Sequence, residues 1–286
     1  MPIKSYLFPG TKSALIKFKL AIYLWLIIII LALVAVAPLN HLVRANLSHL
    51  YLGQPAFIPF ELHLIEIFIA HQDFFQPYLY LLLILFSLTA IIFIFLDAAL
   101  FGRMITSERK ITFSDFLADG SRYFWSFFLS TLLYLPIFIL FFLLSRFLAF
   151  PLNIWAGKSV TEWPVIISSN LKLLLFILLW TASKLIFDLI RIIIIKDQKT
   201  VLLALRQAWF FLSKHFFSLW GLYLLVGLIF VLISIIFLFI GRLISAEHLF
   251  GLVLMIILAQ AYIVFRLFIR MVFIGFENRY YEKNRI

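Results

Sequence analysis

Six ionisable side chains interrupt long apolar stretches of this chain, and their types and spacing suggest chemistry. They are Asp97, Lys184, Asp188, Arg191, Arg266 and Arg270. If the apolar stretches cross a membrane, each charge near mid-depth costs roughly 2.5 kcal/mol or more unless it is paired or hydrated. Such residues therefore mark a binding site, a proton path or a set of ion pairs.

The balance of these charges favours an anion site. Four of the side chains are basic and two are acidic, so a pocket formed by all six carries a net charge of +2. Such a pocket, open to the cytoplasmic leaflet, would bind the phosphate of a lipid headgroup or another anionic amphiphile. The predicted ligand-binding residues are Lys184, Arg191, Arg266 and Arg270. Their predicted charge partners are Asp97 and Asp188.

Two other interpretations fit the same residues. In the first, the charges are structural: Lys184 pairs with Asp188 one helical turn away, and Asp97 pairs with Arg266 or Arg270 of a neighbouring span. Arg191 then extends its side chain to the membrane surface. In the second, the two aspartates relay protons, which requires a path of water molecules.

The composition defines the elements that must position these side chains. The chain has 286 residues, of which 65% are hydrophobic and 13% charged, and its mean hydropathy is +1.13. Such a chain cannot cover itself with polar groups, which excludes a soluble fold. Apolar runs of about 18 residues or more predict an all-α polytopic membrane protein. Six spans are predicted, at residues 20–37, 77–102, 127–148, 171–195, 216–240 and 250–275.

The distribution of basic residues predicts the orientation of these spans. Eighteen of the 24 Lys and Arg residues flank one side of the predicted spans, and five flank the other. Because Lys and Arg are retained on the cytoplasmic side, we expect both termini in the cytoplasm. The same rule explains the net charge of +11, so nucleic acid is not expected as a partner.

Amphipathic segments precede three of the spans and indicate an internal repeat. Residues 112–124 and 200–214 alternate apolar and polar side chains at helical spacing, and residues 11–19 form a weaker counterpart. Each is expected to form a helix on the cytoplasmic membrane surface, and Thr112 with Asp115 forms a capping box at the start of the first. The chain is therefore predicted to be one transmembrane domain, residues 1–286, built from three helical hairpins. The predicted repeats cover about residues 11–110, 111–199 and 200–286.

A stretch of about fifty residues carries a family resemblance. It reads Asp188-Leu-Ile-Arg191, Lys196-Asp197-Gln-Lys199, Ala204-Leu205-Arg206-Gln-Ala208-Trp209 and Gly221-Leu222-Tyr223-Leu224. This pattern resembles a family of uncharacterised bacterial six-span membrane proteins, in which an Asp-x-x-Arg exit precedes an amphipathic helix. The resemblance implies a bacterial cytoplasmic (inner) membrane and six spans, and it carries over no catalytic residue. The first repeat departs from the pattern, since Leu100 stands where the second repeat has Arg191.

The loop after the first span offers weak metal ligands. His63, Glu66 and Asp73 fall roughly on one face of a helix that would begin near Pro59. Their spacing matches no metal motif, and the many apolar residues around them favour a helix lying in the membrane surface. No metal and no other cofactor is therefore predicted. The absence of cysteine also excludes thiolate chemistry.

Three classes of function remain. An intramembrane enzyme is the least favoured, because the sequence has no nucleophile elbow, phosphate-binding glycine loop or zinc-binding helix. Of the other two, the first is a membrane protein of transport or lipid-handling type that binds an anionic amphiphile in the basic pocket. The second is a non-catalytic membrane subunit or scaffold of a larger complex. The expected partners are membrane lipids and, for the second class, other membrane protein subunits.

Overall fold

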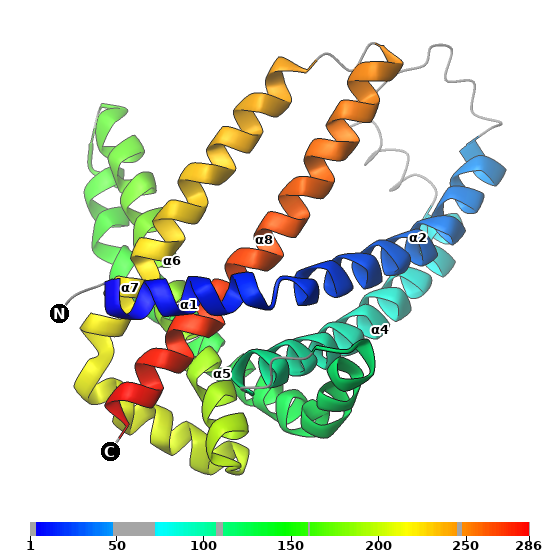
Figure 1. Cartoon of the computed structure of the whole chain (residues 1–286). Helices are drawn as coiled ribbons and strands as arrows, with labels where there is room; N and C mark the ends of the chain where they lie inside the picture. Colours follow the sequence, from blue (N-terminus) through cyan, green and yellow to red (C-terminus); the bar gives the residue numbers. More distant parts are fainter. Residues whose placement is uncertain (1–3, 48–71, 107–110, 160, 245–247, 286) are drawn as a thin grey trace. The chain divides into compact units, whose positions relative to one another are not determined.

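The computed structural model of the protein describes residues 4–47, 72–106, 111–159, 161–244 and 248–285. These residues are almost entirely helical, as the composition predicts (Figure 1). The helices are α1 (Lys4–Ile16), α2 (Lys19–Leu47), α4 (Gln72–Ile105), α5 (Phe113–Gly157), α6 (Trp163–Asp197), α7 (Val201–Leu243) and α8 (Leu249–Asn284). They form two compact units: Met1–Tyr23 with Ile94–Ile286, and Leu24–Phe93.

Six of these helices, α2 and α4 to α8, are long and apolar enough to cross a membrane, and each contains one predicted span. The protein is therefore a multi-pass membrane protein. The smaller unit, Leu24–Phe93, consists of the C-terminal part of α2 and the N-terminal part of α4. Large apolar side chains such as Leu33 and Phe86 are exposed on it, as expected for helices that face lipid.

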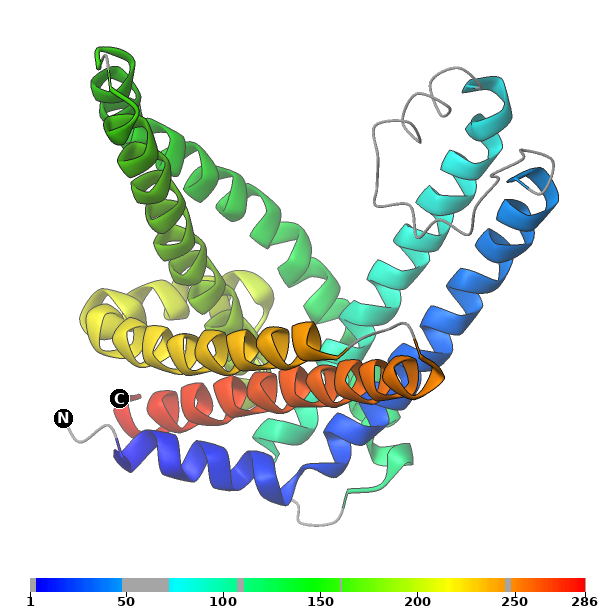
Figure 2. The ribbon, with the colours of Figure 1, turned by 90° about the horizontal axis from the view of Figure 1, so that it is seen from above.

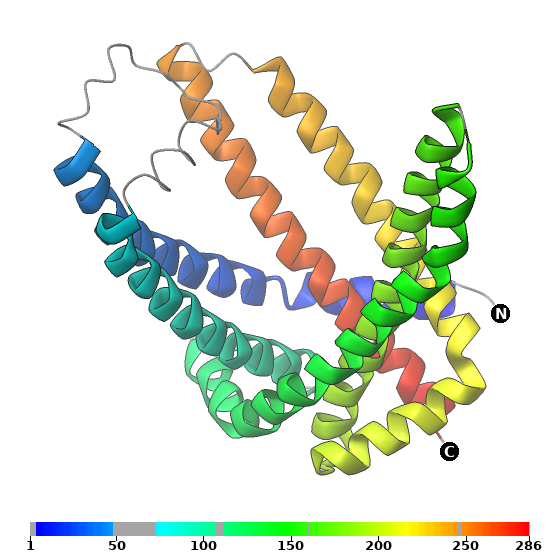
Figure 3. The ribbon, with the colours of Figure 1, turned by 180° about the vertical axis from the view of Figure 1, so that it is seen from behind.

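In the larger unit, α5 packs on α6, and α7 packs on both α6 and α8; Figures 2 and 3 show these helices from different sides. Its core lies towards one end of these helices. The buried side chains of α6 lie almost entirely between Ala182 and Ile195, and those of α8 between Met271 and Tyr281. The other halves of these helices present mostly exposed apolar residues. A polar site within the core must therefore be built at this packed end.

The amphipathic segments differ from the expectation of separate surface helices. Residues 112–124 form the start of α5, and residues 200–214 form the start of α7, and both helices continue into their spans without interruption. The predicted cap at Thr112 is confirmed, because its hydroxyl oxygen accepts a hydrogen bond from the Asp115 amide at 3.2 Å. Helical propensity and backbone hydrogen bonding favour one long helix where no proline or glycine separates the segments. The three-repeat organisation stays a prediction.

Only the N-terminal segment forms a separate helix, α1, and it packs on α8 (Figure 1). The two backbones are in contact where Gly10 meets Gly275. A Cβ atom added at Gly10 would lie 2.8 Å from the amide nitrogen of Phe276, and one added at Gly275 would lie 2.9 Å from the Gly10 carbonyl oxygen. Two glycines that face each other allow this close crossing, which holds α1 beside the last turns of α8.

Candidate functional site

The packed end of the larger unit brings together five of the six predicted polar residues, from three helices. α6 supplies Lys184, Asp188 and Arg191, which share one face because their spacing of four and three residues matches the helical repeat. α4 supplies Asp97, and α8 supplies Arg270. The three helices are therefore linked by charged side chains as well as by apolar packing.

Arg270 and Asp188 form the most buried pair. Two nitrogens of the Arg270 guanidinium donate to the two Asp188 carboxylate oxygens at 2.5 and 2.8 Å. Asp188 is 0% exposed, so the planar fork of the arginine replaces the water that a carboxylate would otherwise bind. A nitrogen of Arg270 also lies 3.9 Å from a carboxylate oxygen of Asp97.

Arg191 connects α6 to both α4 and α5. It forms an ion pair with Asp97, and its second terminal nitrogen donates to the Thr131 hydroxyl at 3.2 Å. Its guanidinium carbon lies 3.8 Å from the centre of the Phe187 ring and 4.8 Å from that of Phe127. Aromatic faces attract a cation most strongly where water is excluded, and Arg191 is buried.

One pairing expected from the sequence is present, because Arg270 lies 3.9 Å from Asp97. Arg191 differs from the expectation, since it is buried and pairs with Asp97 instead of extending to the membrane surface. Lys184 lies within electrostatic range of Arg270 and Asp188, but it forms no ion pair with any described residue.

Arg266 is exposed on α8 and lies outside the cluster. Arg266 also has no ion pair within the described part of the chain, and an arginine at such a position extends towards the membrane surface. The rotation of each helix about its axis decides these partners, and spacing along one helix does not define that rotation.

Glu277 of α8 is a member of the cluster that the sequence did not indicate as one. It lies seven residues after Arg270 on the same helix, within electrostatic range of Asp188, Arg270 and Lys184. It is 0% exposed. Neither carboxylate oxygen has a hydrogen-bond partner among the described residues. The i+7 spacing from Arg270 was the signal that could have identified it.

We predict that Glu277→Gln leaves the free energy of unfolding unchanged or raises it by up to about 1 kcal/mol, because it removes a buried acidic group that makes no hydrogen bond. Asp188→Asn, the matched control, should lower it by about 2 kcal/mol or more, since that carboxylate accepts two charge-assisted bonds. Equilibrium unfolding in mixed detergent micelles measures both variants. If both variants lower the free energy of unfolding by the same amount, Glu277 has a strong hydrogen-bond or ion-pair partner.

The cluster as a whole contains three basic and three acidic groups. Lys184, Arg191 and Arg270 stand against Asp97 and Asp188, with Glu277 as the third carboxylate. Both arginines are bound to carboxylates. The three positive and three negative charges balance, so the cluster lacks the net positive charge expected from the sequence. The geometry instead favours a polar clamp that holds α4, α6 and α8 together.

Helix lengths place this clamp near one face of the membrane. About 31 Å of helix separates Leu249 from Arg270, and about 37 Å separates Trp163 from Asp188. Both lengths reach or exceed the hydrocarbon thickness of about 30 Å. If α6 and α8 enter the membrane near their N-termini, the clamp lies close to the opposite boundary, where charged groups cost less than at mid-depth.

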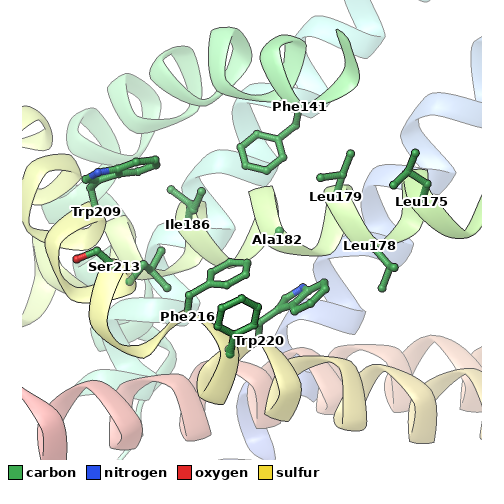
Figure 4. A pocket seen from close by; sticks show the side chains of 12 residues that line it. Phe141, Leu175, Leu178, Leu179, Ala182, Ile186, Trp209, Ser213, Phe216 and Trp220 are labelled. Atoms are coloured by element: carbon green, nitrogen blue, oxygen red, sulfur yellow. The ribbon is translucent and has the colours of Figure 1, made fainter. Parts of the chain in front are cut away.

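Beside the clamp, an apolar groove of about 500 Å³ separates α6 from α7 (Figure 4). Leu175, Leu178, Leu179, Ala182 and Ile186 of α6 and Phe141 of α5 form one side; Trp209, Leu212, Ser213, Phe216, Phe217 and Trp220 of α7 form the other. Figure 4 shows Trp209 and Ser213 at one end of the groove, with Leu175 and Leu178 at the other. Sequence reasoning did not identify this groove, because its side chains are the same types as those that face lipid.

A second groove of about 390 Å³ adjoins the first and shares Phe141, Ile186 and Trp209 with it. It lies at the end near the start of α7, and Arg206 is its charged lining residue. Arg206 is exposed and makes no ion pair within the described ranges. The two adjoining grooves thus form an apolar surface, with the Arg206 guanidinium at the end formed by the second groove.

The weak metal candidates are not among the side chains that the structure describes. His63 and Glu66 lie outside the described residues, and so does the side chain of Asp73. Among the residues that the structure describes, no group of three His, Asp or Glu side chains is arranged to hold a metal ion.

The fold defines a multi-pass helical membrane protein with a buried ionic clamp and an adjoining apolar groove. No family model matches the chain, and neither the curated proteins nor the solved structures give a match. The resemblance to the bacterial six-span family therefore stays a prediction, and the function is argued from the geometry alone.

Proposed function

We propose that this is a non-catalytic membrane protein of transport or lipid-handling type that binds an anionic amphiphile, with the hydrocarbon chain in the groove between α6 and α7. The proposal rests on one observation, an apolar groove between α6 and α7 that adjoins a second groove lined by the exposed Arg206. The bound headgroup lies near Arg206 at the start of α7.

The dimensions of the groove suit a lipid chain. From Leu175 to Ile186, the α6 side of the groove extends along about 16 Å of helix. Half of a hydrocarbon layer of about 30 Å is a similar length, so one acyl chain of one leaflet fills it. Both walls are apolar apart from the Ser213 hydroxyl, and an apolar chain therefore loses no hydrogen bond on entering.

The charges suit an anionic headgroup. Arg206 lines the end of the groove, and the amine of Lys214, two turns further along α7, lies 4.6 Å from the centre of the Phe210 ring. A polybasic surface at the membrane boundary attracts anionic lipids by about 1 kcal/mol per basic residue. The excess of Lys and Arg on this side of the predicted spans supports a cytoplasmic location, in a bacterial inner membrane if the family resemblance holds.

Thermal unfolding in a neutral detergent tests this proposal. We expect added phosphatidylglycerol to raise the melting temperature, because a ligand that binds only the folded state stabilises it. Leu179→Trp fills the groove and should weaken this stabilisation about tenfold in apparent affinity, which corresponds to about 1.4 kcal/mol. Leu173→Trp is the matched control, since Leu173 is an exposed residue of the same helix that does not line the groove.

Headgroup selectivity is measured in the same assay. Arg206→Gln should remove the preference for phosphatidylglycerol over phosphatidylcholine while leaving the binding of phosphatidylcholine unchanged. If neither lipid stabilises the protein, or if both tryptophan variants behave alike, the lipid chain is not in this groove. A fixed partner protein that copurifies and is lost in Leu179→Trp would favour the alternative, a subunit or scaffold of a larger membrane complex.

A further inference from the structure

We propose that a second site, separate from the groove, binds a phosphate group in a basic cavity between α1 and the ends of α4, α6 and α8. This cavity has a volume of about 400 Å³ and lies beside the crossing of α1 and α8. Three of its four basic side chains come from α1, α6 and α8, the fourth comes from the turn that follows α1, and its single carboxylate comes from α8. They are Lys12, Lys17, Lys196, Arg279 and Glu282.

The lysine nearest α4 is already fully engaged and supplies charge to the cavity. The Lys17 amine donates to three carbonyl oxygens in the last turn of α4, those of Arg103, Met104 and Thr106, at 2.6, 3.2 and 2.6 Å. An ammonium has three donors, so all of them are used. The interaction orders the end of α4 and leaves a buried positive charge at the wall of the cavity.

The other basic groups have donors to spare. Lys12 is exposed and has no ion pair with the described residues. Lys196 and Arg279 each reach a different oxygen of Glu282, both at 3.1 Å. An ammonium has three donors and a guanidinium five, so each keeps donors for a second acceptor. In this arrangement, Glu282 occupies the place where the oxygens of an anion would be held.

Asn278 provides the observation that points to a particular anion. It lines the cavity and is 8% exposed, and its side-chain carbonyl oxygen is buried without a hydrogen-bond partner among the described residues. A buried carbonyl oxygen without a donor costs about 1–3 kcal/mol, which a ligand recovers if it donates a hydrogen bond to this oxygen. An anion that pairs here must therefore keep a proton. A phosphate that keeps one hydroxyl meets this condition, whereas sulfate at neutral pH has no proton to donate.

This chemistry fits two sources, a soluble phosphate compound and the phosphate of a membrane lipid. The cavity lies at the packed end of the helices, beside the C-terminal half of α1, and bound phosphate would join α1 to α8 by contacts from Lys12 and Arg279. Binding here depends on none of the groove residues, so each site can be tested with the other intact.

Thermal unfolding of the full chain in phosphatidylcholine nanodiscs tests the proposal with two probes. The first is sodium phosphate, compared with sodium sulfate at equal ionic strength. The second is phosphatidic acid incorporated into the nanodiscs. Stabilisation by phosphate above sulfate identifies a soluble ligand, and stabilisation by phosphatidic acid alone identifies a lipid headgroup; either result supports the site.

Three variants separate the site from general attraction to positive charge. Lys12→Gln should weaken the apparent affinity about tenfold, as expected for the loss of one charge-assisted hydrogen bond. Lys19→Gln removes the same charge from an exposed residue that does not line the cavity, and it should leave the affinity unchanged. Glu282→Gln should increase the affinity, because it releases Lys196 and Arg279 and removes a competing carboxylate.

The opposite results overturn the proposal. If neither probe stabilises the protein, the cavity is not a phosphate site. The same conclusion follows if sulfate stabilises the protein as much as phosphate does and Lys12→Gln has the same apparent affinity as Lys19→Gln. A loss of affinity in Glu282→Gln would contradict the assigned role of that carboxylate. In each case, binding of phosphatidylglycerol in the groove is still tested by comparing Leu179→Trp with Leu173→Trp. Failure of the phosphate site therefore does not decide the proposed function.

Discussion

We expect Arg270→Met to lower the free energy of unfolding by about 3–5 kcal/mol, the usual loss when one partner of a buried ion pair is removed. The reason is the burial of Asp188, which is 0% exposed and receives both of its short hydrogen bonds from Arg270. Without the arginine, its charge stays inside the packed end of the helices. Equilibrium unfolding in mixed detergent micelles measures the loss.

Arg266→Met provides the control on the same helix. Arg266 lies one turn before Arg270 but is exposed, so its replacement should change the free energy of unfolding by less than about 0.5 kcal/mol. The double variant Arg270→Met with Asp188→Leu removes both charges and should recover most of the lost stability. If the two single arginine variants lose the same amount, the Asp188 pair is not the clamp that the geometry indicates.

The second large effect is expected at Arg191. Arg191→Met leaves Asp97 with only the longer contact to Arg270 at 3.9 Å and removes the cation above the Phe187 ring, so we expect a loss of about 3 kcal/mol in the free energy of unfolding. The loss is smaller than at Arg270, because the Asp97 side chain is 30% exposed and water can reach it. The same unfolding measurement checks the value.

Arg191→Lys separates charge from shape. Lysine keeps the positive charge but has no planar group to stack on Phe187 while also donating to Thr131. We expect it to lose about 2 kcal/mol, the energy of a desolvated cation–aromatic contact. Full retention of stability in Arg191→Lys would show that the charge alone matters and that the aromatic contacts do not.

The sequence predicted the membrane spans because that prediction depends on the length and apolarity of single segments. It also indicated which charged residues are exceptional, since Asp97 and Asp188 lie within apolar helices. It could not predict that Arg191 pairs with Asp97, because helix rotation and the packing between helices decide which faces meet. Arg266 shows the same difficulty, since it lies one turn from Arg270 on a helix whose exposed side is not marked by composition.

Two features were missed for different physical reasons. Glu277 precedes a polar C-terminal segment, so its type suggested a position at the membrane surface, whereas α8 continues to Asn284 and α1 covers it at this point. The groove was missed because leucines and aromatic residues that line it have the same character as those facing lipid. A groove in a membrane protein depends on how two helices diverge, and only the arrangement of α6 and α7 shows this.

In the proposed function, the clamp and the groove have complementary roles. The ion pairs hold α4, α6 and α8 at one end of the larger unit, close to Ile186 where the groove begins. Because the clamp stabilises the packed end, the apolar halves of α6 and α7 can remain apart without unfolding of the protein. Arg206 then determines the orientation of a bound amphiphile, whose charged headgroup lies at the start of α7.

Crosslinking with a photoreactive lipid tests the lipid-binding claim most directly. Phosphatidylglycerol with a diazirine in one acyl chain is incorporated into nanodiscs with the full chain, irradiated, and the labelled peptides are identified by mass spectrometry. The account predicts labelling concentrated on residues 175–186 and 209–220, and its loss in Leu179→Trp but not in Leu173→Trp. Labelling spread evenly over all exposed apolar faces, and unchanged by Leu179→Trp, would contradict it.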